Sequence, residues 1–173
     1  FDYKWDLGWM NDTLKYFQED PVYRQYDSHF ITFSMAYFYS ERFLLEFSHD
    51  EVVHGKATII NKMWGLHGDK LAQVKALYVY MMLHPGKKLN FMGNELAEYK
   101  EWDEKKALGW VLLKYPQHDS FHRYFSDLNH LILDHPALYQ YDYYPEGFEW
   151  LVVDDMKQSV FAYARYAPDG EIR

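Results

Sequence analysis

The sequence predicts an α/β fold, with three parallel βα units at residues 1–138 and the beginning of an all-β domain at residues 139–173. Three short apolar runs that alternate with helical spacing of apolar residues predict the parallel units. Two strand-like runs near the end of the chain predict an antiparallel hairpin. A complete (β/α)8 barrel needs about 250 residues, and the chain has 173. The three units therefore fit either the last part of a TIM barrel or a small open parallel sheet.

The first two units occupy the first half of the chain. The run Phe1–Trp5 predicts a short strand, and helical spacing then follows at Phe30, Phe33, Tyr37 and Phe38. The apolar run Phe43–Phe47 predicts a buried second strand. A polar, glycine-containing loop leads to Asp69, which we expect to cap the N-terminus of a second helix. That helix is stopped by Pro85-Gly86 and is marked by Leu71, Val74, Tyr78 and Met81.

The third unit and the hairpin follow from the same signals. The run Leu89–Met92 predicts a strand that Gly93 ends. After a loop rich in charge and tryptophan, residues 121–132 have clean amphipathic spacing, so we expect a helix that closes near Pro136. The runs Phe148–Val153 and Val160–Tyr166 are separated by polar residues and predict the antiparallel hairpin.

Composition narrows the class of partner. The formal net charge is −8, which argues against nucleic acid or a membrane surface as a partner, because both attract basic faces. No apolar run approaches the roughly 18 residues of a membrane span. The chain has no cysteine, which is consistent with a reducing compartment, and we expect a cytoplasmic protein. Aromatic residues make up 20% of the chain; most are expected to pack in the core, but such rings also bind the apolar faces of sugars.

Ionisable side chains gather where the predicted strands end. His49-Asp50-Glu51 follows the second strand, Asn94-Glu95 and then Trp102 follow the third, and Trp5-Asp6 ends the first. The carboxyl ends of parallel strands are where active sites lie in βα folds. The structural alternative is a helix cap, a role that Ser48 or Asp50 could fill. Carboxylates beside aromatic rings suit cleavage of a glycosidic bond, which needs one carboxyl group as acid and a second as nucleophile or base.

A metal site fits the same residues poorly. In the zincin motif two histidines stand four residues apart, whereas His49 and His54 stand five apart. On a helix with about 100° per residue they would diverge by roughly 140°. Glu51 and His54 have the Glu-x-x-His spacing of di-iron bundles, which need two such motifs, and the sequence has one. We therefore expect neither a metal nor a cofactor.

Three segments of the chain, together with a fourth near its end, resemble the 1,4-alpha-glucan (glycogen) branching enzymes of the alpha-amylase superfamily. Leu45–Lys56 resembles the segment around their last catalytic aspartate. Phe1–Leu14 is similar to the segment after the sixth barrel strand, and His84–Glu95 to the eighth strand and its loop. Pro145–Trp150 is similar to the entry to their C-terminal β domain. The resemblance implies that the chain is the C-terminal part of a catalytic TIM barrel, and that it begins partway through a longer protein.

The resemblance also implies a reaction and a set of site residues. An α-1,4-glucan chain would be cleaved, held as a covalent glucosyl-enzyme and transferred to a 6-hydroxyl, making an α-1,6 branch in glycogen biosynthesis. Asp50 would stabilise the transition state, and the substrate-binding residues would be His49, Glu51, Trp5, Asp6, Glu95 and Trp102. The nucleophile and the general acid/base would precede Phe1. The chain departs from the usual pattern at Leu96, Glu98 and Asp103, on the rim of the eighth-strand loop, positions that bear on the length of chain preferred.

Two alternatives remain beside the branching enzyme. One is a non-catalytic glucan-binding module, favoured by the aromatic content and by the absent nucleophile. The other is an alpha-amylase-type hydrolase. On any of these readings the partner is an α-1,4-glucan or glycogen. We expect the chain alone to be catalytically inactive, and to self-associate or pair with the rest of the barrel, because a partial barrel leaves strand edges unpaired.

Overall fold

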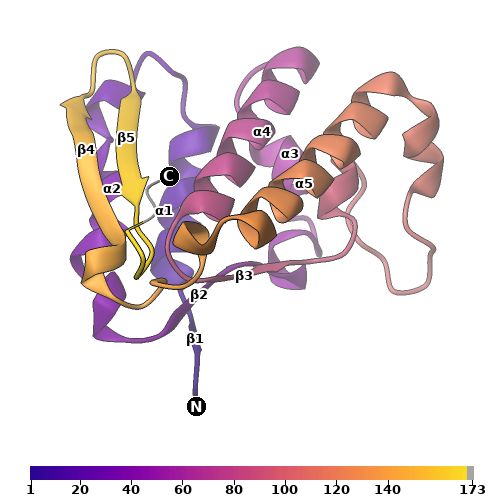
Figure 1. The fold of residues 1–173 in the computed structure, drawn as a ribbon. Helices are drawn as coiled ribbons and strands as arrows, with labels where there is room; N and C mark the ends of the chain where they lie inside the picture. Colours follow the sequence, from indigo (N-terminus) through magenta and orange to yellow (C-terminus); the bar gives the residue numbers. More distant parts are fainter. Residues whose placement is uncertain (171–173) are drawn as a thin grey trace.

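A three-stranded parallel sheet carries the fold of the computed structural model, which describes residues 1–170 (Figure 1). The strands are β1 (Lys4–Trp5), β2 (Phe43–Phe47) and β3 (Lys87–Asn90), and their order in the sheet is β1-β2-β3. A separate two-stranded sheet is formed by β4 (Phe148–Asp155) and β5 (Val160–Arg165). The predicted parallel βα arrangement and the predicted antiparallel hairpin are both confirmed.

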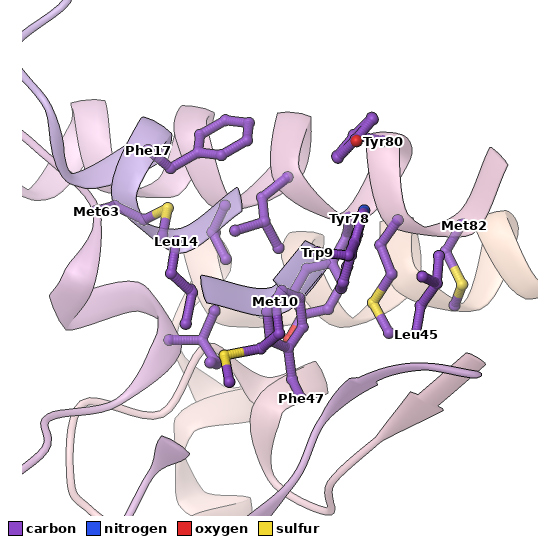
Figure 2. Packing of buried hydrophobic residues seen from close by; sticks show 14 of the residues in the cluster. Trp9, Met10, Leu14, Phe17, Leu45, Phe47, Met63, Tyr78, Tyr80 and Met82 are labelled. Carbon is purple, nitrogen blue, oxygen red and sulfur yellow. The ribbon is translucent and has the colours of Figure 1, made fainter. Parts of the chain in front are cut away.

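The two faces of the parallel sheet have different surroundings. Successive strand residues point to opposite faces, so Leu45 and Phe47 of β2 point the same way. Both are fully buried, and the ring of Phe47 lies 5.4 Å from the ring of Trp9 and 6.0 Å from that of Tyr78. Figure 2 shows Phe47 close to Trp9, which lies on helix α1 (Leu7–Gln18), and to Tyr78, which lies on helix α4 (His67–Leu83). Glu46 and Leu44 point to the opposite face, together with Trp5, which is the register partner of Leu44.

The helix α1 (Leu7–Gln18) directly follows β1 and was not predicted. Asp6 caps it, because its Oδ1 accepts a hydrogen bond from the Trp9 amide at 2.9 Å. Its buried face has helical spacing that the sequence does contain: Trp9, Met10, Thr13, Leu14, Tyr16 and Phe17. Only Asp6 separates this helix from the strand before it.

The predicted helix around Phe30–Phe38 is wrong as a single element. The structure instead has four short turns there: η1 (Arg24–Tyr26), α2 (His29–Thr32), η2 (Phe33–Ala36) and η3 (Phe38–Ser40). Tyr80 contacts this segment from far along the chain, because its hydroxyl donates to the carbonyl of Ile31 at 2.7 Å.

The predicted second helix is confirmed, with shifted ends, as α4 (His67–Leu83). Two short helical turns, η4 (His49–Glu51) and α3 (Ile59–Lys62), lie in the segment predicted as a loop. Asp69 is not the N-cap as predicted: α4 begins two residues earlier, and the Asp69 carboxylate accepts from the amide of Leu66 at 3.0 Å. The helix ends before His84-Pro85, as expected, because the residue before a proline is pushed into extended backbone.

The third unit is also confirmed with small shifts. β3 lies two residues earlier than predicted, although the Phe91 amide still donates to the carbonyl of Phe47 at 2.9 Å. Short turns η5 (Asn94–Leu96) and η6 (Trp110–Lys114) interrupt the loop that follows. The amphipathic helix is α5 (Pro116–Asp134), and η7 (Pro136–Leu138) follows it.

The hairpin is tied to the rest of the fold by one buried ion pair. After η8 (Pro145–Gly147), Arg165 of β5 is 1% exposed and donates to Oδ1 of Asp142 at 2.9 Å. The same guanidinium donates to the carbonyl of Leu83 at the end of α4 and to that of Gly147. The boundary of a second domain at residue 139 remains a prediction, and residues 171–173 lie outside the described part of the chain.

Candidate active site at the strand ends

The carboxyl end of β2 carries an ordered turn, η4, that presents two adjacent polar side chains. Ser48 caps it: its Oγ accepts from the Asp50 amide at 3.2 Å. Glu51 completes a capping box, since its Oε2 accepts from the Ser48 amide at 2.7 Å and from the Ser48 hydroxyl at 2.8 Å. His49 and Asp50 are left facing solvent, with side chains 51% and 58% exposed and His49 Nε2 3.3 Å from Asp50 Oδ1.

A hollow of about 610 Å³ opens beside His49. Its wall includes the indole of Trp102, which meets the ring of Phe91 edge-on at 5.1 Å, while Phe91 lies 5.8 Å from the imidazole of His49. Carboxylates also line it, at Glu98, Glu101, Asp103 and Glu104. A concave site of this size, with an aromatic wall and a few polar groups, suits a sugar unit.

Of the seven predicted site residues, the structure gathers three: His49 and Trp102 line this hollow, and Asp50 contacts His49. Glu51 is buried, and its Oε2 serves the capping box. Asp6 is buried as the cap of α1, and also accepts from the Tyr37 hydroxyl at 2.8 Å.

The other two predicted residues lie apart from the hollow. Trp5 is 43% exposed on the sheet face turned away from the helices. Glu95 accepts from the Gly93 amide at 2.8 Å, and it lines a different hollow between β3 and α5. Glu51, Glu95 and Asp6 share one pattern, because each carboxylate accepts a hydrogen bond from a nearby backbone amide.

Two residues that sequence reasoning did not single out as site residues hold the loop after η4. Glu101 accepts hydrogen bonds from the amides of Gly55 and Ala57, and Lys62 donates to carbonyls of the same loop. The sequence signal for Glu101 was its place beside Trp102. Nothing local marks Lys62, because its partners belong to a separate turn.

Glu46 and Asp6 form a pair of buried carboxyl groups near the carboxyl ends of β2 and β1. Glu46 of β2 is fully buried, and its Oε2 accepts from the Asp6 amide at 3.1 Å. Among residues 1–170, Oε1 of Glu46 and Oδ2 of Asp6 are buried with no hydrogen-bond partner. Burial, with the nearby charges of Asp6 and Glu51, raises the pKa of Glu46 to about 8. At neutral pH the Glu46 carboxyl therefore holds its proton.

Residues 1–170 contain neither a cluster of metal ligands nor a membrane-spanning helix. No group of three or more histidine, aspartate or glutamate side chains in that range is arranged so that it could hold a metal ion. None of the helices in that range is both long and apolar enough to cross a membrane.

Comparison with known proteins identifies close relatives over almost the whole chain. The chain is 48% identical over 171 residues to the 1,4-alpha-glucan branching enzyme GlgB of Pseudomonas putida, covering 99% of the chain and 23% of that protein. It is 48% identical over 171 residues to GlgB of Aquifex aeolicus (99% and 27%), and 50% identical over 168 residues to GlgB of Novosphingobium aromaticivorans (97% and 23%). No family model matches the chain.

The fold has a counterpart among solved structures. The crystal structure of an alpha-amylase from H. orenii matches with a TM-score of 0.61 at 14% identity, covering 97% of this chain and 37% of that one. At this identity the match concerns the fold alone. The chain spans about a quarter of the length of the branching enzymes it matches. Over almost its whole length the chain is therefore similar to one segment of the 1,4-alpha-glucan branching enzymes.

Proposed function

We propose that the protein containing this chain is a 1,4-alpha-glucan branching enzyme, and that this chain supplies part of its glucan site. The observation that carries the proposal is the pair His49 and Asp50, exposed at the end of β2 beside a hollow walled by Trp102. Identity of about half with the branching enzymes supports the class of reaction. The reaction is proposed for the whole protein, because the chain spans only about a quarter of its relatives.

The geometry supports a division of roles within the site. Asp50 is proposed to place its negative charge near the positive charge that develops on the sugar in an oxocarbenium-like transition state. His49, held beside Asp50, is proposed to hydrogen-bond a sugar hydroxyl, and Trp102 to offer its ring to an apolar sugar face. Glu51 is proposed to act through the capping box that orients Asp50, since its Oε2 is engaged there.

Linkage analysis of the products tests the reaction type. The whole protein acting on amylose is expected to produce α-1,6 linkages, because transfer to a 6-hydroxyl creates them. New reducing ends without α-1,6 linkages would indicate a hydrolase of the alpha-amylase type instead. The absence of any product would contradict both readings.

We also infer that the chain by itself self-associates. β1 and β3 each pair only with β2, so in the described part of the chain their outer edges have no strand partner. A hollow of about 900 Å³ adjoins β3, lined by apolar side chains that include Phe125, Ile132 and Leu138. Open strand edges beside apolar surface pair readily with other chains. Light scattering on the purified chain at high concentration is expected to give a mass above 21.0 kDa; a clean monomer would contradict this.

A further inference from the structure

The loop that follows Asp50 has an unusual backbone. Between Val53 and Thr58 three residues have positive φ: His54 at 56°, Gly55 at 80° and Ala57 at 64°. Glycine adopts this conformation freely, but histidine and alanine do so rarely, and such residues persist only where their surroundings hold them. The contacts of this loop therefore identify what fixes its shape.

Glu101 holds the loop through its amides. Its Oε2 accepts from the Gly55 amide at 2.9 Å and its Oε1 from the Ala57 amide at 2.7 Å, across 46 and 44 residues of sequence. These two hydrogen bonds, with the nearby charge of Lys62 and despite some desolvation, hold the pKa of Glu101 below its ordinary value. The carboxylate is therefore ionised at neutral pH and accepts two charge-assisted hydrogen bonds.

Lys62 of α3 holds the same loop through its carbonyls. Its ammonium donates to the carbonyl of Glu51, to that of Lys56 at 2.6 Å and to that of Ala57 at 2.7 Å. The amides of the loop thus face an anion and its carbonyls face a cation. Both side chains come from outside the loop.

The residue after Glu101 extends the connection to the site. The Trp102 amide donates to the carbonyl of Val52 at 3.0 Å. The segment Glu101-Trp102 is therefore hydrogen-bonded both to the loop and to the residue just before it. The Trp102 ring packs on Phe91, and Phe91 on His49. A shift of Glu101 would therefore move the wall of the hollow relative to His49.

We infer that Glu101 is a positioning residue that locks the loop after β3 onto the loop after β2, so that Trp102 and His49 line one hollow. The identity of the ligand, an α-glucan, rests on the proposed function; the lock itself does not.

Amide exchange measured by NMR on the chain and on Glu101→Gln tests the lock. The variant is expected to exchange the Gly55, Ala57 and Trp102 amides at least about tenfold faster, because a charged acceptor is lost and the two loops separate. In the unmodified chain the Gly55 and Ala57 amide shifts are expected to titrate with an inflection below the ordinary glutamate pKa, and this inflection should vanish in Glu101→Gln. Glu104→Gln is the matched control, since Glu104 lines the same hollow without accepting from these amides. It should change neither the exchange rates nor the pH titration of the amide shifts.

Two outcomes would overturn the inference: unchanged exchange at Gly55 and Ala57, or faster exchange there with the Trp102 amide unaffected. Titration with maltoheptaose adds a separate arm, in which Glu101→Gln is expected to weaken binding at least about fivefold. Glu146→Gln, a change of the same charge at an exposed residue outside the hollow, is expected to weaken it less than about twofold. Equal affinity of chain and Glu101→Gln would also count against positioning. If the unmodified chain shows no saturable binding, the chain alone is not a glucan-binding module, while the exchange data still decide the lock.

Discussion

Replacing Arg165 with methionine is expected to lower the free energy of unfolding of the chain by about 3–5 kcal/mol, the usual cost of breaking a buried ion pair from one side. The change leaves the Asp142 carboxylate, 2% exposed, without its guanidinium partner. It also removes the donors to the carbonyls of Leu83 and Gly147. Lys87 still neutralises part of the Asp142 charge, because its Nζ lies 3.1 Å from Asp142 Oδ2. We therefore expect the loss of stability to lie at the lower end of this range.

Urea unfolding of matched variants measures this loss. Arg123→Met removes an exposed partner of Asp119 and is expected to leave the unfolding midpoint almost unchanged. Adding Asp142→Leu to Arg165→Met is expected to recover much of the stability, because the stranded charge is then gone. Equal losses for Arg165→Met and Arg123→Met would show that the hairpin is not held by this ion pair.

Glu46→Gln is expected to change how stability depends on pH. The ordinary pKa of 4.5 is raised to about 8 in the folded chain, by burial first and then by Asp6 and Glu51. The folded state thus holds a proton that the unfolded state releases, so stability is full below pH 4.5 and is lost as pH rises through about 8. The loss is on the order of 3 kcal/mol, given about 1.4 kcal/mol per unit and some allowance for relaxation.

The glutamine introduced by Glu46→Gln is the isostere of the protonated glutamate, so the variant should lack this loss. Unfolding free energies of the chain and of Glu46→Gln, measured at pH 5 and pH 9, are expected to diverge toward the higher pH, with the variant the more stable there. Glu104→Gln, an exposed change of the same charge, should follow the unmodified chain. Parallel curves for the chain and Glu46→Gln would mean that Glu46 is ionised in the folded state.

The fold was predictable where local pattern and tertiary packing agree. β2 was predicted to the residue, and α4, α5 and the hairpin follow from apolar spacing bounded by proline or glycine. Around Phe30–Phe38 the same kind of spacing misled: the structure has short turns there, and Tyr80, distant in sequence, contacts one of them at the Ile31 carbonyl. A single sequence carries no information about that contact.

The candidate site was predictable in its place but less so in its membership. The strand-end rule led to His49 and Trp102, which line one hollow, and to Asp50, which contacts His49. It also led to Asp6 and Glu51, whose carboxylates accept from local backbone amides instead. A capping carboxylate and a substrate-binding one look alike in sequence. Their roles separate only when the hydrogen-bond partners are known.

Branch formation by the whole protein with Asp50→Asn is the most direct test of the role proposed for Asp50. Asparagine keeps the shape of Asp50 and removes its charge, so the rate of α-1,6 linkage formation on amylose is expected to fall at least about 100-fold. Glu146→Gln, a change of the same charge at an exposed residue outside the hollow, is expected to keep the rate within about twofold. Asp50→Asn protein that is folded and forms branches at the full rate would contradict the assignment of Asp50 to the reaction.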